Sequence, residues 1–183
     1  MTILLILIAL VALVVLWGIG VQRQLVSAEE ICKNSLSQIG VQQNSRWDAL
    51  TALLEMVKSY NEHEYNTLKD VVAMRKNITG SSTAAEANAQ EEALGKLVSG
   101  LNVVVERYPD LKANENYAKT MDSINTYENN VRMARMTYND TVTKYNRMVR
   151  QFPDSFIAGL LHFGTREYLA EPAGKTEMPS MKI

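Results

Sequence analysis

The chain begins with an uninterrupted apolar run. No residue from Ile3 to Val21 carries a charge, and the first basic side chain is Arg23. At ~1.5 Å per residue, a helix over this run is about 28 Å long, close to the ~30 Å hydrocarbon core of a bilayer. Trp17 lies near one end, where aromatic rings favour the lipid–water interface. The pattern predicts a transmembrane anchor over residues 1–22.

Two other interpretations of this run are a cleaved signal peptide and a buried core helix. A signal peptide has a basic first region and a shorter apolar core, but here only Met1 and Thr2 precede the run. The segment Val26–Ala28 nevertheless resembles a cleavage site, so cleavage stays open as an alternative. A core helix would be apolar on one stripe, whereas this run is apolar on all sides.

Charge at the ends of the anchor indicates its orientation. Arg23 and Lys33 follow the run, whereas no Lys or Arg precedes it. The positive-inside rule therefore favours an outside N-terminus and a cytoplasmic domain. The single cysteine, Cys32, cannot form an intrachain disulfide and gives no sign of an oxidising compartment.

The remainder of the chain repeats apolar residues at helical spacing, with no strand-like alternation. Gln22–Tyr60 contains no proline and one glycine, Gly40, so the anchor is predicted to continue as a stiff helical stalk. Within it, residues 42–46 are polar on all sides and form the weakest part of the pattern. A second helix is predicted from Tyr65 to Ile78, with Gly80 ending it in a left-handed conformation.

A third helix has clear start and stop signals. Thr83 and Glu86 fit a capping box, in which each side chain bonds the other's free backbone N–H. An amphipathic stripe then continues to Tyr108, where Pro109 stops the helix. Asp110 is predicted to cap the helix that follows.

The fourth predicted helix, Leu111–Gln151, would be about 60 Å long. An apolar residue recurs there at every seventh position: Tyr117, Ile124, Val131, Tyr138, Tyr145 and Phe152. A sustained seven-residue period is typical of long helices that pack at a shallow angle. After Pro153, a short helix is predicted over Ser155–Leu169, with His162 as a packing residue.

Together these elements predict an all-α fold. The N-terminal transmembrane helix, residues 1–22, continues into a helical-bundle domain, residues 23–170. That domain is an antiparallel bundle of three long helices plus a short C-terminal helix. The tail, residues 171–183, contains proline and glycine and is predicted to be irregular.

One stretch of the fourth helix is unevenly charged. The formal net charge of the whole chain is only -1, and no basic tail is present, which argues against a nucleic-acid partner. The stretch from Val131 to Gln151 nevertheless contains five basic residues and only one acid, Asp140. The basic residues form a candidate docking patch for an acidic partner. The patch comprises Arg132, Arg135, Lys144, Arg147 and Arg150. The alternative is a solvated face partly neutralised by Asp48 and Glu55. With three alternating long helices, this stretch would lie far from the bilayer.

No catalytic, cofactor or metal site is predicted. His63 lies between two glutamates, but adjacent helical residues point in different directions, whereas helical metal sites use spacings of three or four. A solvated helix junction is the favoured interpretation. Cys32 lacks a base partner in the sequence and is expected to be a buried thiol.

Two Tyr-Asn pairs follow the seven-residue period of the fourth helix. Tyr138 and Tyr145 fall in the apolar seam and are expected to pack in the core with bonded hydroxyl groups. Asn139 and Asn146 follow them and are expected to bond to a neighbouring helix, which would fix the register.

Several motifs resemble the LemA family. They include the YPDLKAN segment at Tyr108–Asn114, the segment Ala134–Asp140, the pair Tyr145-Asn146 and the closing residues Pro179–Ile183. The resemblance covers nearly all of the chain after the anchor. It departs from the family pattern at Gly40, where an acidic residue is usual. The resemblance implies a bacterial single-pass membrane protein with an antiparallel helical bundle and no established biochemical activity.

We therefore expect a membrane-anchored helical interaction protein, a scaffold or adaptor without catalytic activity, in the bacterial inner membrane. Family members are often encoded near membrane-bound zinc proteases or TPM-domain proteins. The resemblance thus suggests such a protein as partner and a role in envelope proteostasis. The alternative is a self-assembling structural protein, a homo-oligomer that organises or shapes the membrane. A hydrolase or ligand-binding enzyme is the third hypothesis.

Overall fold

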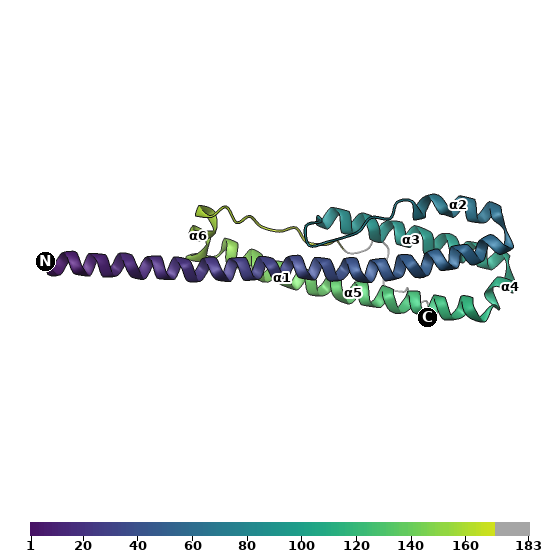
Figure 1. Cartoon of the computed structure of the whole chain (residues 1–183), viewed down its shortest axis with the longest axis horizontal. Helices are drawn as coiled ribbons and strands as arrows, with labels where there is room; N and C mark the ends of the chain where they lie inside the picture. The colour runs from purple at the N-terminus through teal and green to yellow at the C-terminus, as the bar shows by residue number, and fades with distance from the viewer. Residues whose placement is uncertain (171–183) are drawn as a thin grey trace, which may run out of the picture.

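A computed structural model describes residues 1–170 as an elongated rod of α-helices (Figure 1). This part of the chain contains no strand, so the predicted all-α fold is confirmed. The helices are α1 (Thr2–Tyr60), α2 (Glu62–Val72), α3 (Ala84–Arg107), α4 (Pro109–Lys112), α5 (Glu115–Arg150) and α6 (Asp154–Leu160). The tail predicted to be irregular, residues 171–183, lies outside the described residues.

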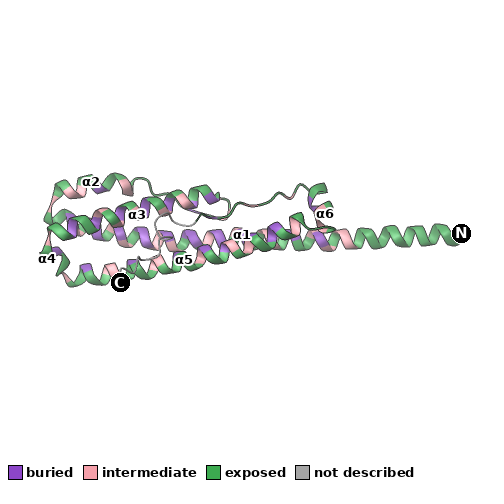
Figure 2. Ribbon diagram, turned by 180° about the vertical axis from the view of Figure 1, so that it is seen from behind, coloured by how far each residue is buried: buried purple, intermediate pink, exposed green. Residues whose placement is uncertain are grey.

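α1 is the axis of the molecule. It continues without a break for 59 residues, which corresponds to about 88 Å. Its first turns are exposed on all sides, and burial begins at Val21 (Figure 2). The helix is therefore long and apolar enough at its N-terminal end to cross a membrane, and its second half is a core element of the bundle. The predicted stalk follows directly from the absence of a helix breaker.

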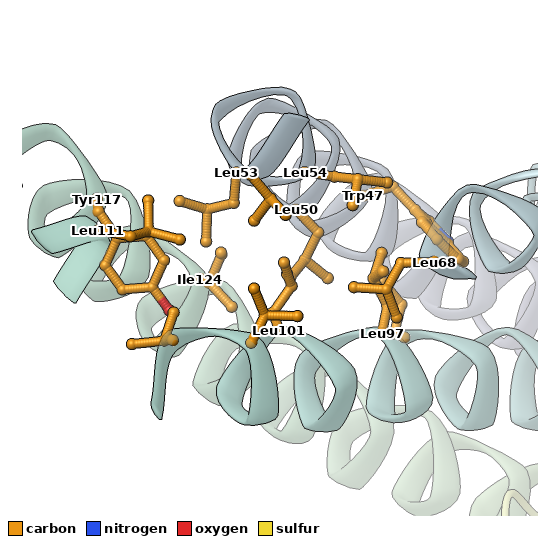
Figure 3. Packing of buried hydrophobic residues seen from close by; sticks show 14 of the residues in the cluster. Trp47, Leu50, Leu53, Leu54, Leu68, Leu97, Leu101, Leu111, Tyr117 and Ile124 are labelled. Carbon is orange, nitrogen blue, oxygen red and sulfur yellow. The ribbon is translucent and has the colours of Figure 1, made fainter. Parts of the chain in front are cut away.

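The core of the bundle forms where α3 and α5 pack along the second half of α1. Leu50 of α1, Leu97 and Leu101 of α3, and Ile124 of α5 are all fully buried and converge in one cluster (Figure 3). α2 contributes Leu68 from outside. Burial of a leucine side chain stabilises the fold by about 1.5–3 kcal/mol, so this cluster is the main source of cohesion.

The polar interval at residues 42–46 is a buried cross-link and not a weak point. The Arg46 side chain is only 3% exposed, and its guanidinium lies 2.8 Å from Glu91 of α3 and 2.9 Å from Glu128 of α5. The Gln43 amide donates to the Ala87 carbonyl of α3 at 3.1 Å. A buried cation is tolerated only where anions surround it. Because the two anions come from α3 and α5, this layer connects the three long helices.

The seven-residue seam of α5 is confirmed at its first five positions. The side chains at these positions are buried: Tyr117, Ile124, Val131, Tyr138 and Tyr145. Phe152 is an exception and is 82% exposed, because α5 ends two residues before it. At the other end the cap differs from the prediction, since Asn114 accepts from Asn116 and Tyr117 and Asp110 lies within α4.

An irregular strap, residues 73–83, replaces the end of the predicted second helix. α2 ends at Val72, and the strap crosses α1 where Gly40 leaves room: a Cβ there would lie 1.9 Å from the Ile78 carbonyl oxygen. Gly80 also serves a close approach, to Lys33, and not a helix end. The capping box of α3 at Thr83 is confirmed.

Buried Gln90 of α3 fixes the start of the strap to the bundle. Its amide nitrogen donates to the Met74 carbonyl at 2.9 Å, and its oxygen accepts from Lys76 N–H at 2.8 Å. The Trp47 indole donates to the same oxygen at 3.2 Å. These bonds satisfy strap backbone groups that the missing helix would otherwise have paired.

α6 is shorter than the predicted helix over Ser155–Leu169. It ends at Leu160, because His162 adopts a φ of 61° and the Phe163 N–H turns back to the Ala158 carbonyl at 2.9 Å. His162 is exposed and does not pack in the core as expected. Residues 161 and 162 form the turn, and residues 163–170 then run back along the bundle without helical structure (Figure 1). We call this stretch the C-terminal segment.

Candidate functional site

Asn139 and Asn146 of α5 hold the C-terminal segment by its backbone. The Asn139 amide donates to the Leu169 carbonyl at 3.1 Å and accepts from the Leu169 N–H at 2.9 Å. The Asn146 amide does the same at Arg166, with distances of 2.9 Å and 2.8 Å. We call these two residues the asparagine ladder. The expectation that they bond to a neighbouring helix is wrong.

The ladder works because two repeats match. Seven residues of α-helix advance by about 10.5 Å, and three residues of extended chain advance by about 10 Å. Asn139 and Asn146 are seven apart, and Leu169 and Arg166 are three apart, so both amides meet a backbone N–H and C=O in register. The Tyr138 hydroxyl adds a bond to the Glu167 carbonyl at 3.1 Å. The ladder therefore binds the segment through main-chain hydrogen bonds, as in other modes of extended-peptide binding.

Arg135 ends this array and is not part of a docking surface. It is only 7% exposed, and its guanidinium donates to Asn88 of α3 at 2.8 Å and to the Ala170 carbonyl. Burial lowers the pKa of Arg135, whereas the carboxylate of Glu91 opposes that shift. Arg135 therefore fastens α3 and the C-terminal segment to α5, and its place in the predicted docking patch is wrong.

Cys32 lies beneath the C-terminal segment. The thiol is fully buried in the cluster that contains Tyr138 and Tyr145. Burial raises the pKa of Cys32, and a hydrogen bond from Thr141 opposes the shift only in part. A thiol that is sealed and protonated is a poor nucleophile, which agrees with the packing role expected for it. Above it, Arg166 pairs with Glu29 at 3.0 Å and closes the layer.

Three basic residues near the end of α5 are free for a partner. Lys144, Arg147 and Arg150 are exposed, and no carboxylate within residues 1–170 pairs with them. We call these residues the basic end. Arg132 is also exposed but bonds the Asn129 side chain at 2.9 Å. In the alternative interpretation, Asp48 and Glu55 of α1 would neutralise this charge.

Those two acids lie elsewhere and do not neutralise the basic end. Asp48 pairs with Arg75 at 2.7 Å, and Glu55 accepts from the Tyr65 hydroxyl at 3.2 Å. The positive charge of the basic end is therefore not neutralised by these two acids. Arg135, in contrast, is buried in the bundle.

The basic end lies beside the exit of the apolar helix, not far from it as expected. Met148 and Val149 of α5 pack with Val21 and Leu25 of α1. A distal position would require three alternating passes along the rod. However, α2 and α3 are separate passes, so α5 is the fourth and returns to the apolar end (Figure 1).

The region around His63 is a helix junction. Asn61 caps α2 by accepting from His63 N–H at 2.8 Å, and the His63 side chain is exposed. Glu64 pairs with Arg107 at 2.9 Å. Within residues 1–170, no three His, Cys, Asp or Glu side chains gather where they would bind a metal ion.

Several known proteins are similar to this chain in sequence. Protein LemA of Metamycoplasma hominis is 22% identical over 144 residues, which cover 76% of this chain and 64% of that protein. Magnetosome protein MamQ 2 of Paramagnetospirillum magneticum is 33% identical over 85 residues, 46% of this chain and 30% of the relative. Magnetosome protein MamQ of Magnetospirillum gryphiswaldense is 29% identical over 92 residues, 50% of this chain and 32% of the relative.

The chain thus spans about a third of the length of these magnetosome proteins and just under two thirds of Protein LemA. The family model described as LemA family matches residues 35–183, which is most of the chain and includes the later part of the stalk, most of the bundle and the asparagine ladder. The resemblance predicted from the motifs is confirmed, and the chain belongs to the LemA family.

Proposed function

We propose that this protein is a membrane-anchored helical scaffold or adaptor with no catalytic activity of its own. The observation that carries the proposal is the continuity of α1. The apolar N-terminal part of this helix is not buried by any described part of the chain, yet the same helix continues into the core of the bundle. Such an exposed apolar helix is stable in a bilayer, where its backbone is satisfied internally and its side chains meet lipid.

The bundle favours binding over chemistry. Its buried cation Arg46 is paired with carboxylates of two other helices, and its thiol is sealed. What it offers to a partner is a rigid rod whose basic end carries three exposed cations that pair with no carboxylate of residues 1–170. Long-range attraction to an acidic protein surface steers association and sets specificity. The basic end therefore fits an acidic membrane protein.

A membrane protease or a TPM-domain protein is the partner that we propose, with a role in envelope proteostasis. This suggestion rests on the LemA resemblance alone. We place the protein in the bacterial inner membrane with its N-terminus outside and its bundle in the cytoplasm, because Arg23 and Lys33 follow the anchor. Protease digestion of inverted membrane vesicles should remove the bundle, whereas digestion of right-side-out vesicles should leave it intact. The opposite pattern would reverse the assignment.

Affinity purification from native membranes tests the partner. The variant Lys144→Glu/Arg147→Glu/Arg150→Glu should lose a heterologous protein that the unaltered chain retains. A matched variant reverses three exposed lysines elsewhere on the bundle: Lys69→Glu/Lys96→Glu/Lys112→Glu. This control should retain the partner. Equal retention by both variants, or no heterologous protein on the unaltered chain, would contradict a docking role for the basic end.

The second candidate function is self-assembly into a structure that organises or shapes the membrane. Met133 and Met136 are large apolar side chains exposed on α5, and relatives of this chain are named magnetosome proteins. Apolar residues on the outside of a long helix can pack between copies. A mass measurement of the full chain in mild detergent separates the candidates, since a sharp monomer would exclude self-assembly.

A further inference from the structure

α6 lies against the end of the apolar part of α1. Ala158 is fully buried in a cluster with Val21 and Leu25, and Ile157 and Trp17 both pack against this cluster. The Ile157 Cδ1 atom lies 3.5 Å from the position that a Cβ would take at Gly18. The inward face of this short helix is therefore fixed to the same turns of α1 that end the apolar run.

The outward face of α6 and its flanks is also apolar, although nothing among the described residues covers it. Phe152 is 82% exposed, Phe156 69%, Leu160 65% and Leu161 44%. These four side chains lie within ten residues of one another along the chain. A group of exposed large apolar side chains of this kind indicates contact with a membrane or another protein.

The position of α6 along α1 identifies the membrane as the occupant. The apolar run Ile3–Val21 measures about 28 Å, so nearly all of it is needed to fill the ~30 Å hydrocarbon core. Gly18 lies three residues before the end of that run, which is about 4.5 Å inside it. Since Ile157 contacts α1 at this level, the exposed face of α6 lies at the hydrocarbon boundary and not in bulk water.

Charge around α6 agrees with this depth. Arg23, Arg147 and Arg150 are exposed next to the exit of α1, against one partly buried acid, Asp154, at the start of α6. Basic side chains just outside the hydrocarbon boundary bind anionic headgroups, and aromatic and aliphatic residues between them enter the acyl boundary. Aromatic Trp17 marks the same interface from within α1.

We propose that α6, with Phe152 and Leu161, is a second membrane contact. It inserts its apolar face into the interfacial layer of the leaflet from which α1 emerges and braces the rod against tilting. The proposal rests on the membrane anchoring proposed above. The asparagine ladder supports it, because binding of the C-terminal segment to α5 holds the chain that follows α6 in place.

Lipid-borne quenchers test the contact in the full chain. Cys32→Ala removes the native thiol, and Phe156→Cys introduces one for an environment-sensitive nitrobenzoxadiazole fluorophore. The protein is reconstituted in vesicles of phosphatidylcholine and phosphatidylglycerol, with or without lipids that carry a nitroxide either near the headgroup or midway along the acyl chain. Two matched positions with exposed side chains serve as controls: Leu10→Cys in the apolar run and Met136→Cys on α5, away from the bilayer.

The expected result is a loss of fluorescence at positions 10 and 156 with nitroxide lipids, and at position 136 with aqueous iodide only. If position 156 is quenched by iodide and not by nitroxide lipids, while position 10 is quenched by lipid, α6 lies in water and only this inference fails. If position 156 is shielded from both quenchers, a second copy of the chain covers α6, and the inference again fails. If position 10 is also quenched by iodide alone, the anchoring itself is wrong.

Discussion

Removal of one rung of the asparagine ladder has an effect that the structure defines. The Asn146 amide makes two hydrogen bonds to the backbone of Arg166, at 2.9 Å and 2.8 Å. A buried hydrogen bond contributes about 0.5–1.5 kcal/mol net, so Asn146→Ala should weaken docking of the C-terminal segment by about 1–3 kcal/mol. At ~1.4 kcal/mol per tenfold change, the segment should open about 5- to 140-fold more often.

Amide hydrogen exchange of the full chain in lipid nanodiscs measures this opening. Peptides that contain Arg166 and Leu169 should lose protection in Asn146→Ala, whereas peptides of the α1–α3 core should keep it, because the segment is not part of that core. Asn125→Ala, at an exposed position of the same helix, should leave both unchanged. Unaltered protection at Arg166 in Asn146→Ala would refute the ladder as the element that holds the segment.

Three further predictions concern stability, measured by urea unfolding of the full chain in detergent. Gly40→Ala should destabilise by about 1–3 kcal/mol because its Cβ meets the strap, whereas Gly95→Ala, with no atom within 4 Å, should stabilise slightly; equal effects would contradict the close approach. Arg46→Met should cost about 3 kcal/mol because it removes the buried cation that Glu91 and Glu128 share; a neutral result would dismiss the cross-link. Stability should fall above pH 9.0, because buried Cys32 stays protonated when folded and ionises when unfolded; a flat profile would count against this.

Features with a local cause were predictable from the sequence. The apolar run, the absence of breakers up to Tyr60, the capping box at Thr83 and the period of seven on α5 each act within a few turns of helix. Local periodicity is the strongest signal that a single chain carries. The all-α fold and the buried tyrosines followed from these signals.

Features that depend on distant partners were not predictable. Arg46 falls in the polar interval that is the weakest part of the helical pattern, and its buried role is not visible there because its two carboxylates are 45 and 82 residues away. The seven-residue spacing of Asn139 and Asn146 is visible in the sequence, but their hydrogen-bond partners are not. Those partners are main-chain groups of the C-terminal segment, which produce no side-chain pattern. The predicted depth of the basic end is wrong for a related reason: periodicity within each helix does not show how the helices alternate along the rod, where α2, α3 and α5 are successive passes after α1 (Figure 1).

The central claim is that the chain is a membrane-anchored interaction protein whose basic end docks a partner. Chemical crosslinking in native membranes, followed by purification and identification of the crosslinked proteins, tests it most directly. The account predicts a defined heterologous membrane protein that is lost when Lys144, Arg147 and Arg150 are reversed in charge. A ladder of self-crosslinks alone would contradict the account and would establish a homo-oligomeric membrane scaffold in its place.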